Sequence, residues 1–440
     1  MRFTPWATRL ALTLSLSATA FLTACGGGGG GGGSAQIRLV NATASFATID
    51  LSVNDKTVNS KVASGTASEY ASADSGAQTV RVLAGDASNS VVAISPTLAG
   101  GTNYTVFAYG FASSVRVSLL EDTQAAAESG KSKLLVQNLA LDAGPVDVYL
   151  LGPNDNVDTV TASVTNLNAG AGSGYITLNA GTYRVRVTGT GKRSDLRLDV
   201  PAATLDSTGV HALMLTSASS GTLVNAVQLT QKGAVKAFAN TLTRVRAVNA
   251  LSGTPLVAAS VNGTALLPAS LPPNVSEYAT LPAGAGNATV TVNGAAIGVT
   301  SQTLAAGGDY TLLISGTPAT AAGVWINDDN RLPTTSGTAK IRLINGLSDP
   351  SAVTTLNVDF TAVVSNVLPG TASAAQTINT GTTGSLITVN SPLQLTPLYN
   401  PATGISTSGV TQLTSGGVYT IFVMGDPKAN PVAGKLAKDR

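Results

Sequence analysis

The sequence predicts an all-β protein with four tandem Ig-like antiparallel β-sandwich domains, preceded by a signal peptide and a poly-glycine tether. Three observations predict this class. Two short signatures recur four times in the same order along the 440 residues. Runs of β-branched residues alternate with turn residues about every 8–12 positions, as in sandwiches. No stretch of useful length has helical periodicity.

The first 24 residues have the pattern of an export signal. Arg2 and Arg9 supply positive charge, and an apolar run follows from Leu10 to Leu22. This run is too short and too rich in Ser and Thr to span a bilayer, which takes about 20 apolar residues. We therefore expect residues 1–24 to be a signal peptide that is removed from the mature protein.

The signal peptide ends in Leu22-Thr23-Ala24-Cys25, which resembles the lipobox of bacterial lipoproteins. The resemblance implies cleavage before Cys25, a diacylglycerol on its thiol and an acyl chain such as palmitate on its new amine. Cys25 is the only cysteine in the chain. The alternative is an ordinary signal peptide followed by an incidental cysteine.

Residues 25–35 form a linker that contains eight consecutive glycines, 26–33. Such a tract is a flexible coil with a reach of about 27 Å, so it can hold the first domain away from a lipid surface. In lipoproteins of Gram-negative bacteria an Asp after the cysteine favours the inner membrane. Because Gly26 stands there, we expect anchoring at the outer membrane, facing the periplasm or the cell surface.

The charge balance of the mature chain argues against nucleic acid as a partner. Removal of residues 1–24 takes away two arginines and leaves 23 basic and 23 acidic residues. The densest basic cluster is Lys192-Arg193. Binding to nucleic acid needs a concentrated basic surface.

The first repeated signature is a strand that ends in Asn. The asparagines are 97, 111 and 96 residues apart. The four strands are Ile37-Arg38-Leu39-Val40-Asn41, Leu134-Leu135-Val136-Gln137-Asn138, Val245-Arg246-Ala247-Val248-Asn249 and Ile341-Arg342-Leu343-Ile344-Asn345. The second signature is a Leu followed six residues later by a ring. The pairs are Leu98 and Tyr104, Leu205 and His211, Leu304 and Tyr310, and Leu413 and Tyr419.

These signatures place the sandwich domains at residues 36–122, 133–230, 243–328 and 339–430. Asn54-Asp55, Asn262-Gly263 and Asn293-Gly294 predict hairpin turns. The polar joints between the domains predict beads with limited mutual contact.

The repeats resemble a bacterial family, domain of unknown function 4397. The resemblance rests on the opening strand Ala339 to Asn345, the strand Pro145 to Tyr149, the turn and strand Leu98 to Thr105, and Asp328-Asp329. It covers nearly all of residues 36–430. Units two and four lack the Ser-Glu-Tyr found at Ser68-Glu69-Tyr70 and Ser276-Glu277-Tyr278. The resemblance implies exported or cell-surface β-domains, often in tandem, and implies no established activity.

Candidate catalytic groups are sparse. His211 is the only histidine and stands where the other units have Tyr, so we expect it to fill the same packing position. Ser207 is nearby but lacks a nucleophile elbow. Gly130-Lys131-Ser132 has no earlier glycine of a phosphate loop. We expect no enzyme activity and no cofactor.

Two oxygen-rich segments are candidates for calcium. The first offers Asn154, Asn156 and Asp158, and the second runs from Asn327 to Asn330. Turn chemistry explains both without a metal, and we favour that interpretation.

Arg38, Arg246 and Arg342 occupy one position of the first strand. They could line a repeated ligand ridge, but we expect them on a solvated or edge strand. The tyrosines are expected to be core or corner rings rather than a glycan-stacking platform. These are Tyr70, Tyr104, Tyr278, Tyr310 and Tyr419.

The sequence thus predicts a non-catalytic, membrane-anchored envelope lipoprotein. Its membrane contact is the lipid on Cys25, and its domains would serve as a spacer and as a binding array for an envelope or extracellular protein or glycan. One alternative is a cell-envelope hydrolase or its accessory subunit, which would need facing carboxylates. Another is a purely structural stalk.

Overall fold

The computed structural model describes residues 33–84, 90–152, 155–381, 384–390, 393–398, 410–429 and 431–440. Cys25, the signal peptide and Asn154 lie outside these residues. The described chain is almost entirely β, with one short 3-10 turn, η1 (Leu141–Ala143). Within this part of the chain, no helix has the length and hydropathy needed to cross a membrane.

The strands fall into four successive units, each with its own hydrophobic core between two main sheets. Unit 1 contains β1 (Ser34–Thr43), β2 (Thr48–Val53), β3 (Lys56–Ala63), β4 (Ala71–Asp74), β5 (Gly76–Ala77), β6 (Val80–Ala84), β7 (Ser90–Ile94), β8 (Thr97–Leu98), β9 (Asn103–Gly110) and β10 (Arg116–Glu121). Unit 2 contains β11 (Lys131–Asn138), β12 (Val146–Leu151), β13 (Val164–Leu167), β14 (Gly172–Asn179), β15 (Gly181–Gly189), β16 (Lys192–Leu205), β17 (Val210–Ser217), β18 (Val224–Thr230) and β19 (Val235–Phe238).

The third and fourth units repeat this plan. Unit 3 contains β20 (Leu242–Asn249), β21 (Val257–Val261), β22 (Thr264–Ser270), β23 (Asn274–Val275), β24 (Ala279–Pro282), β25 (Gly284–Gly286), β26 (Ala288–Val292), β27 (Ala295–Ile297), β28 (Gln302–Leu304), β29 (Asp309–Ser315) and β30 (Ala322–Asp328). Unit 4 contains β31 (Thr338–Leu347), β32 (Thr354–Val358), β33 (Thr361–Val367), β34 (Thr371–Ala372), β35 (Gln376–Asn379), β36 (Ser385–Val389), β37 (Leu393–Pro397), β38 (Val410–Thr411), β39 (Val418–Gly425) and β40 (Val432–Lys438).

Each unit has one sheet built around its first strand and a second sheet built from hairpins. In unit 1 the two strand orders are β10-β9-β1-β4 and β3-β2-β6-β7. The prediction of an all-β protein of tandem sandwiches is confirmed. One feature was not predicted: the first strand pairs in parallel with the strand that carries the signature ring. The parallel pairs are β1 with β9, β11 with β17, β20 with β29 and β31 with β39.

The predicted hairpin turns are confirmed. At Asn262-Gly263 both residues have positive φ, 49° and 79°, and Val261 pairs with Thr264 across the turn. This is the two-residue geometry that matches strand twist and favours Asn-Gly. The turns at 54–55 and 293–294 pair their flanking strands in the same way.

The asparagine of each first-strand signature ties the two sheets together, although β1 and β31 continue two residues beyond it. Asn41, Asn138, Asn249 and Asn345 are all fully buried. In unit 4 the Asn345 amide donates to Ala352 O at 2.8 Å and Val367 O at 2.9 Å, and its oxygen accepts from Leu347 N. A buried amide whose donor and acceptor atoms are both hydrogen-bonded to backbone groups explains why this residue type recurs.

The signature rings lie in the core and close a backbone corner. Tyr310 Oη accepts a hydrogen bond from Ala305 N at 2.8 Å, and Tyr104 and Tyr419 make the same bond in their units. His211 Nε2 accepts from Asp206 N at 3.2 Å. The expectation that His211 takes the tyrosine position is therefore confirmed.

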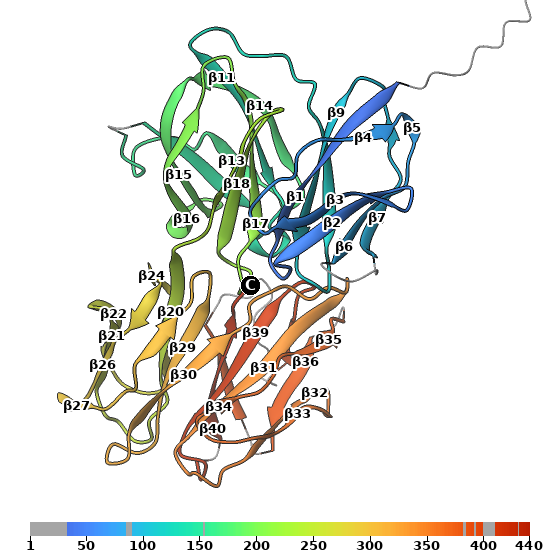
Figure 1. Ribbon diagram of the computed structural model, residues 1–440. Helices are drawn as coiled ribbons and strands as arrows, with labels where there is room; N and C mark the ends of the chain where they lie inside the picture. Colours follow the sequence, from blue (N-terminus) through green and yellow to red (C-terminus); the bar gives the residue numbers. More distant parts are fainter. Residues whose placement is uncertain are drawn as a thin grey trace, which may run out of the picture.

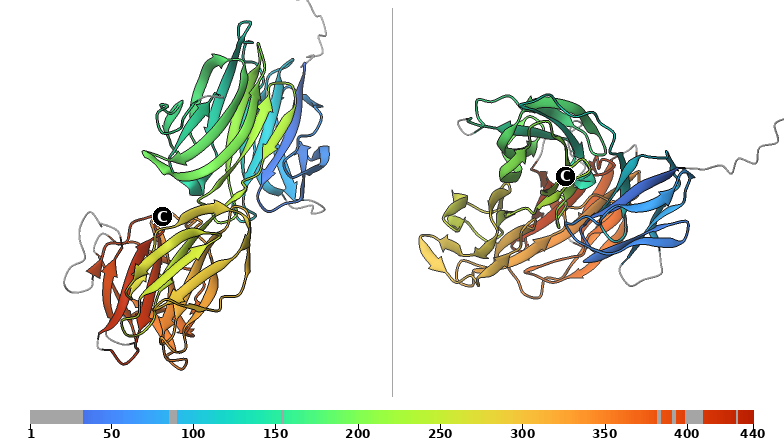
Figure 2. Two further views of the ribbon diagram at one scale, coloured as in Figure 1. Left: turned by 90° about the vertical axis from the view of Figure 1, so that its left-hand side faces the viewer. Right: turned by 45° about the horizontal axis from the view of Figure 1, so that its top comes forward.

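The units are joined in two face-to-face pairs, so the expectation of beads with limited contact is wrong. The sheet of β1 and β9 packs on the sheet of β17 and β18, and one buried cluster contains Val40, Phe107, Met214 and Leu229. A second cluster, including Val248 and Phe422, joins units 3 and 4. In Figure 1 the pair of units 1 and 2 lies above the pair of units 3 and 4, and Figure 2 shows the same stacking from two other sides.

Candidate functional site: the polar junction between units

A buried triad of Arg, Thr and Asp occurs in units 1, 3 and 4. In unit 3, Arg246 Nε donates to Thr311 Oγ1 at 2.9 Å, and Thr311 donates to Asp328 Oδ2 at 2.6 Å. The same two bonds occur in unit 1 among Arg38, Thr105 and Asp122, and in unit 4 among Arg342, Thr420 and Asp439. The Arg and Thr of each triad face each other across the parallel strand pair.

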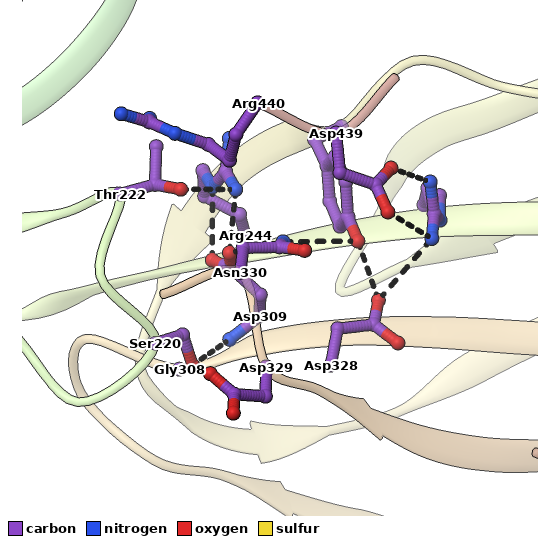
Figure 3. A network of polar contacts seen from close by, with 12 residues as sticks. Ser220, Thr222, Arg244, Gly308, Asp309, Asp328, Asp329, Asn330, Asp439 and Arg440 are labelled. Atoms are coloured by element: carbon purple, nitrogen blue, oxygen red, sulfur yellow. Dashed lines mark hydrogen bonds and ion pairs between the residues drawn. The ribbon is translucent and has the colours of Figure 1, made fainter. Parts of the chain in front are cut away.

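Units 3 and 4 exchange their arginines in a reciprocal way. Arg246 of unit 3 pairs with Asp439 of unit 4 at 2.5 Å, and Arg342 of unit 4 pairs with Asp328 of unit 3 at 2.7 Å. Part of this arrangement is visible in Figure 3. Burial by itself would raise the pKa of Asp328, but the charges of Arg342 and Arg246 lower it below its ordinary value. The interface thus holds an ionised carboxylate and its partners in a buried setting.

The first pair of units is built differently. Arg38 of unit 1 donates to the backbone oxygens of Gly233 at 2.6 Å and Thr230 at 3.3 Å in unit 2. Unit 2 has no triad, because the positions that face each other are Leu135 and Ala212. Arg38 therefore meets backbone oxygens of unit 2 and not a carboxylate.

The expectation for these arginines was wrong. Arg38, Arg246 and Arg342 are only 4%, 2% and 4% exposed, and their strands are central in their sheets, not at an edge. The strand alternates between two buried faces: Ile37 and Leu39 enter the core of unit 1, whereas Val40 enters the contact between units. The strand is therefore covered on both sides, and Arg38 lies on the face that contacts the neighbouring unit.

Two tyrosines complete the triads of units 1 and 3. Tyr70 Oη donates to Asp122 Oδ2 at 2.5 Å, and Tyr278 Oη donates to Asp328 Oδ2 at 2.5 Å. Burial and the bond to Asp122 raise the pKa of Tyr70 to about 12. The guanidinium of Arg38 lies 4.8 Å from the Tyr70 ring centre, so the ring is covered by a cation and not presented as a stacking platform.

The serine that precedes these tyrosines is present in every unit, although the full Ser-Glu-Tyr is not. Ser68 Oγ accepts the N–H of Leu39, and Ser276 accepts that of Ala247. Ser173 and Ser373 accept the equivalent N–H groups in units 2 and 4.

A second buried network fixes unit 2 against unit 3. Arg244 makes a two-pronged bond to Asp309, at 2.9 and 2.5 Å, and also donates to Thr222 Oγ1 of unit 2 at 2.8 Å. Ser220 Oγ of unit 2 accepts from Asp309 N at 2.9 Å, as drawn in Figure 3. Nearby charge from Asp309 outweighs burial and raises the pKa of Arg244 above its ordinary value.

Unit 2 also contacts the joint between units 3 and 4. Asp142 in η1 accepts from Leu332 N at 2.8 Å, and Arg440 donates to the Asp142 backbone oxygen. A cavity of about 750 Å³ that is open to solvent lies between units 2, 3 and 4. Its wall includes Arg197, Arg244, Tyr278 and Arg440.

The remaining predicted site residues lie elsewhere. Asn156 Oδ1 accepts from Asp158 N at 2.9 Å in a turn, and in the described part of the chain no three His, Cys, Asp or Glu side chains cluster as metal ligands would. In the second calcium candidate, Asp328 binds arginine as above. Ser207 accepts from Gly130 N, so the structure does not pair it with His211.

These features define a class: an all-β protein of tandem β-sandwich repeats, joined through buried polar contacts. Residues 35–149 and 243–356 match a family described as a domain of unknown function, DUF4397. The two matches cover more than half of the 440 residues, and the chain belongs to this family. Each match begins at the first strand of unit 1 or 3 and continues into the unit that pairs with it. Such repeats fit a structural or binding role.

No curated protein matches the chain. Among solved structures, the Bacillus anthracis TIE protein is similar at 12% identity over 64% of this chain and 49% of that chain, with a TM-score of 0.15. The chain spans about half the length of that protein, and a similarity at this TM-score carries no argument.

Proposed function

We propose that this protein is a non-catalytic envelope lipoprotein, anchored through lipid on Cys25 at the outer membrane of a Gram-negative bacterium. Its paired sandwiches serve as a spacer and as a platform that binds a protein or glycan of the envelope or the cell exterior. Because the units pack in pairs, the spacer is more rigid than a chain of separate domains would be.

One observation carries the proposal: the charged and aromatic residues repeated in the units are engaged in holding units together. The triads of Arg, Thr and Asp are buried, Tyr70 and Tyr278 are partly buried, and these residues are bonded to one another or to the neighbouring unit. Residues used in this way stabilise a fixed arrangement of units. The surface loops and outer sheets then remain for recognition.

The anchor is tested by labelling cells with radioactive palmitate. Wild-type protein is expected to take up label and to enter the detergent phase of a Triton X-114 extract, and Cys25→Ser is expected to do neither. A matched Ser34→Ala variant leaves the anchor intact and should behave as wild type. Equal labelling of Cys25→Ser would refute lipidation at this residue.

The binding role is tested by affinity capture from an envelope extract with the soluble chain that starts at Ser34. A protein or glycan that is retained specifically, and that also binds in purified form, supports the proposal. Failure on capture and on glycan arrays would refute the platform and leave a structural stalk. Protease treatment of intact cells distinguishes surface exposure from a periplasmic position.

A further inference from the structure

The cavity between units 2, 3 and 4 is built from segments far apart in the chain. Unit 2 contributes the end of η1 at Ala143 and Gly144, the turn around Thr190, and Arg197. Unit 3 contributes Arg244 and the segment 275–278, and unit 4 contributes residues 437–440. Its volume of about 750 Å³ lies within the range of about 300–1,000 Å³ that small-molecule sites occupy.

Cations outnumber anions on the wall of this cavity. Six basic residues line it, namely Lys192, Arg197, Arg244, Arg246, Lys438 and Arg440, against three acidic residues. Three of these cations are already in ion pairs, Arg197 with Asp195 at 2.7 Å, Arg244 with Asp309 at 2.5 Å and Arg246 with Asp439 at 2.5 Å. Among the described residues, Lys192, Lys438 and Arg440 have no carboxylate within ion-pair distance. Glu277 is exposed.

Arg440 is a partly buried lining cation without an ion pair among the described residues. Its guanidinium donates to the Asp142 backbone oxygen, and no carboxylate of the described residues lies within ion-pair distance of it. Figure 3 shows it beside Arg244 and Thr222. Burial and the charges of Arg197 and Arg244 lower the pKa of Arg440 to about 10. A cation held among cations is stabilised when an anion arrives.

The wall also holds unused hydrogen-bonding capacity. Thr190 lines the cavity, and its buried Oγ1 has no hydrogen-bond partner in the part of the chain that the structure describes. Ser194 contributes a further hydroxyl group, whereas the hydroxyl groups of Thr222 and Ser276 on the same wall are already hydrogen-bonded. Polar groups that converge with cations in a concave site are suited to a hydrophilic anion rather than to an apolar ligand.

We propose that this cavity binds a small hydrophilic ligand through an anionic group with carboxylate or phosphate oxygens, which contacts Arg440 next to Arg197. The guanidinium presents planar N–H donors that match both groups. The inference rests on the proposed binding function and specifies a ligand class for it. Trigalacturonate and inorganic phosphate represent the two sources of this chemistry.

The test is calorimetric titration of the soluble chain that starts at Ser34 with trigalacturonate, sodium phosphate and neutral maltotriose. Binding of at least one anion, with none for maltotriose, supports the proposal, and the tighter anion identifies the source. Arg440→Gln should weaken that binding at least tenfold, and Lys192→Gln at the exposed rim should weaken it several-fold. Lys56→Gln, an exposed residue of unit 1, is the control and should bind as wild type.

Absence of binding by both anions, or unchanged affinity in Arg440→Gln and Lys192→Gln, would overturn the inference. If Arg440→Gln fails to fold, Lys192→Gln alone decides. The outcome is separable from that of the proposed function. A partner captured equally well by wild type and Lys192→Gln, together with failed titrations, leaves the platform standing and removes only the anion site.

Discussion

Asp328→Asn should destabilise unit 3 strongly, because it removes the charge that faces Arg342 across the unit 3–4 interface. The pair is 2.7 Å apart, the aspartate side chain is 0% exposed and the arginine side chain is 5% exposed. Loss of one partner leaves a buried charge uncompensated, which costs about 3–5 kcal/mol. With a urea dependence of at most about 3 kcal/mol per molar, the midpoint should fall by about 1 M or more.

The assay is urea unfolding of the chain that starts at Ser34, followed by tryptophan fluorescence. Of the two tryptophans only Trp325 remains in this chain, and it packs against the core of unit 3. The control is Asp199→Asn, which breaks pairs with Arg184 and Arg186, whose side chains are 51% and 25% exposed. That change should cost less than about 1 kcal/mol. A midpoint shift for Asp328→Asn no larger than the control would refute the reasoning.

Three further predictions concern pH and packing. The folded pKa of Asp328 is lowered, so the stabilisation that its carboxylate gives is complete above the ordinary value of 3.8 and is lost as pH falls through the folded pKa. The urea midpoint reported by Trp325 should therefore fall below about pH 4. An unchanged midpoint at pH 3 contradicts this. Burial, opposed by the charge of Asp206, lowers the pKa of His211 below 6.5, so its neutral form stabilises the fold above that value and the benefit is lost on acidification. The melting temperature of His211→Tyr minus that of the wild type should therefore be larger at pH 5 than at pH 8. An identical pH dependence of the two melting temperatures would disprove this. Gly308→Ala should destabilise unit 3 by about 1–3 kcal/mol in urea unfolding, because the added Cβ would lie 2.7 Å from the Tyr310 ring. The control Gly298→Ala places its Cβ in open space and should leave the midpoint unchanged. Equal midpoints for the two variants would count against the packing argument.

The local features were predictable because they depend on residues close together in the chain or on a repeated period. Asn262-Gly263 identified its hairpin, and the position of His211 relative to the other rings predicted its place in the core. The pairing of units was not predicted, because the alternation within β1 was interpreted as one buried and one solvated face. The almost unbroken apolar run of β9 was a signal of burial on both sides.

The triads also left a sequence signal that a single motif search misses. Arg and Thr are separated by 67, 65 and 78 residues in units 1, 3 and 4, and Thr and Asp by 17, 17 and 19. Only alignment of the units with one another makes these positions coincide. The exchange between Arg246 and Asp439 could not be predicted in this way, because it depends on how two units face each other.

The central claim is that the units form fixed pairs stacked into one body, and small-angle X-ray scattering of the chain that starts at Ser34 tests it most directly. A compact globule of this length has a radius of gyration of about 22 Å. The account predicts a value only a few ångströms larger, unchanged by dilution. A radius on the order of 35 Å or more, as expected of separated beads, would contradict it.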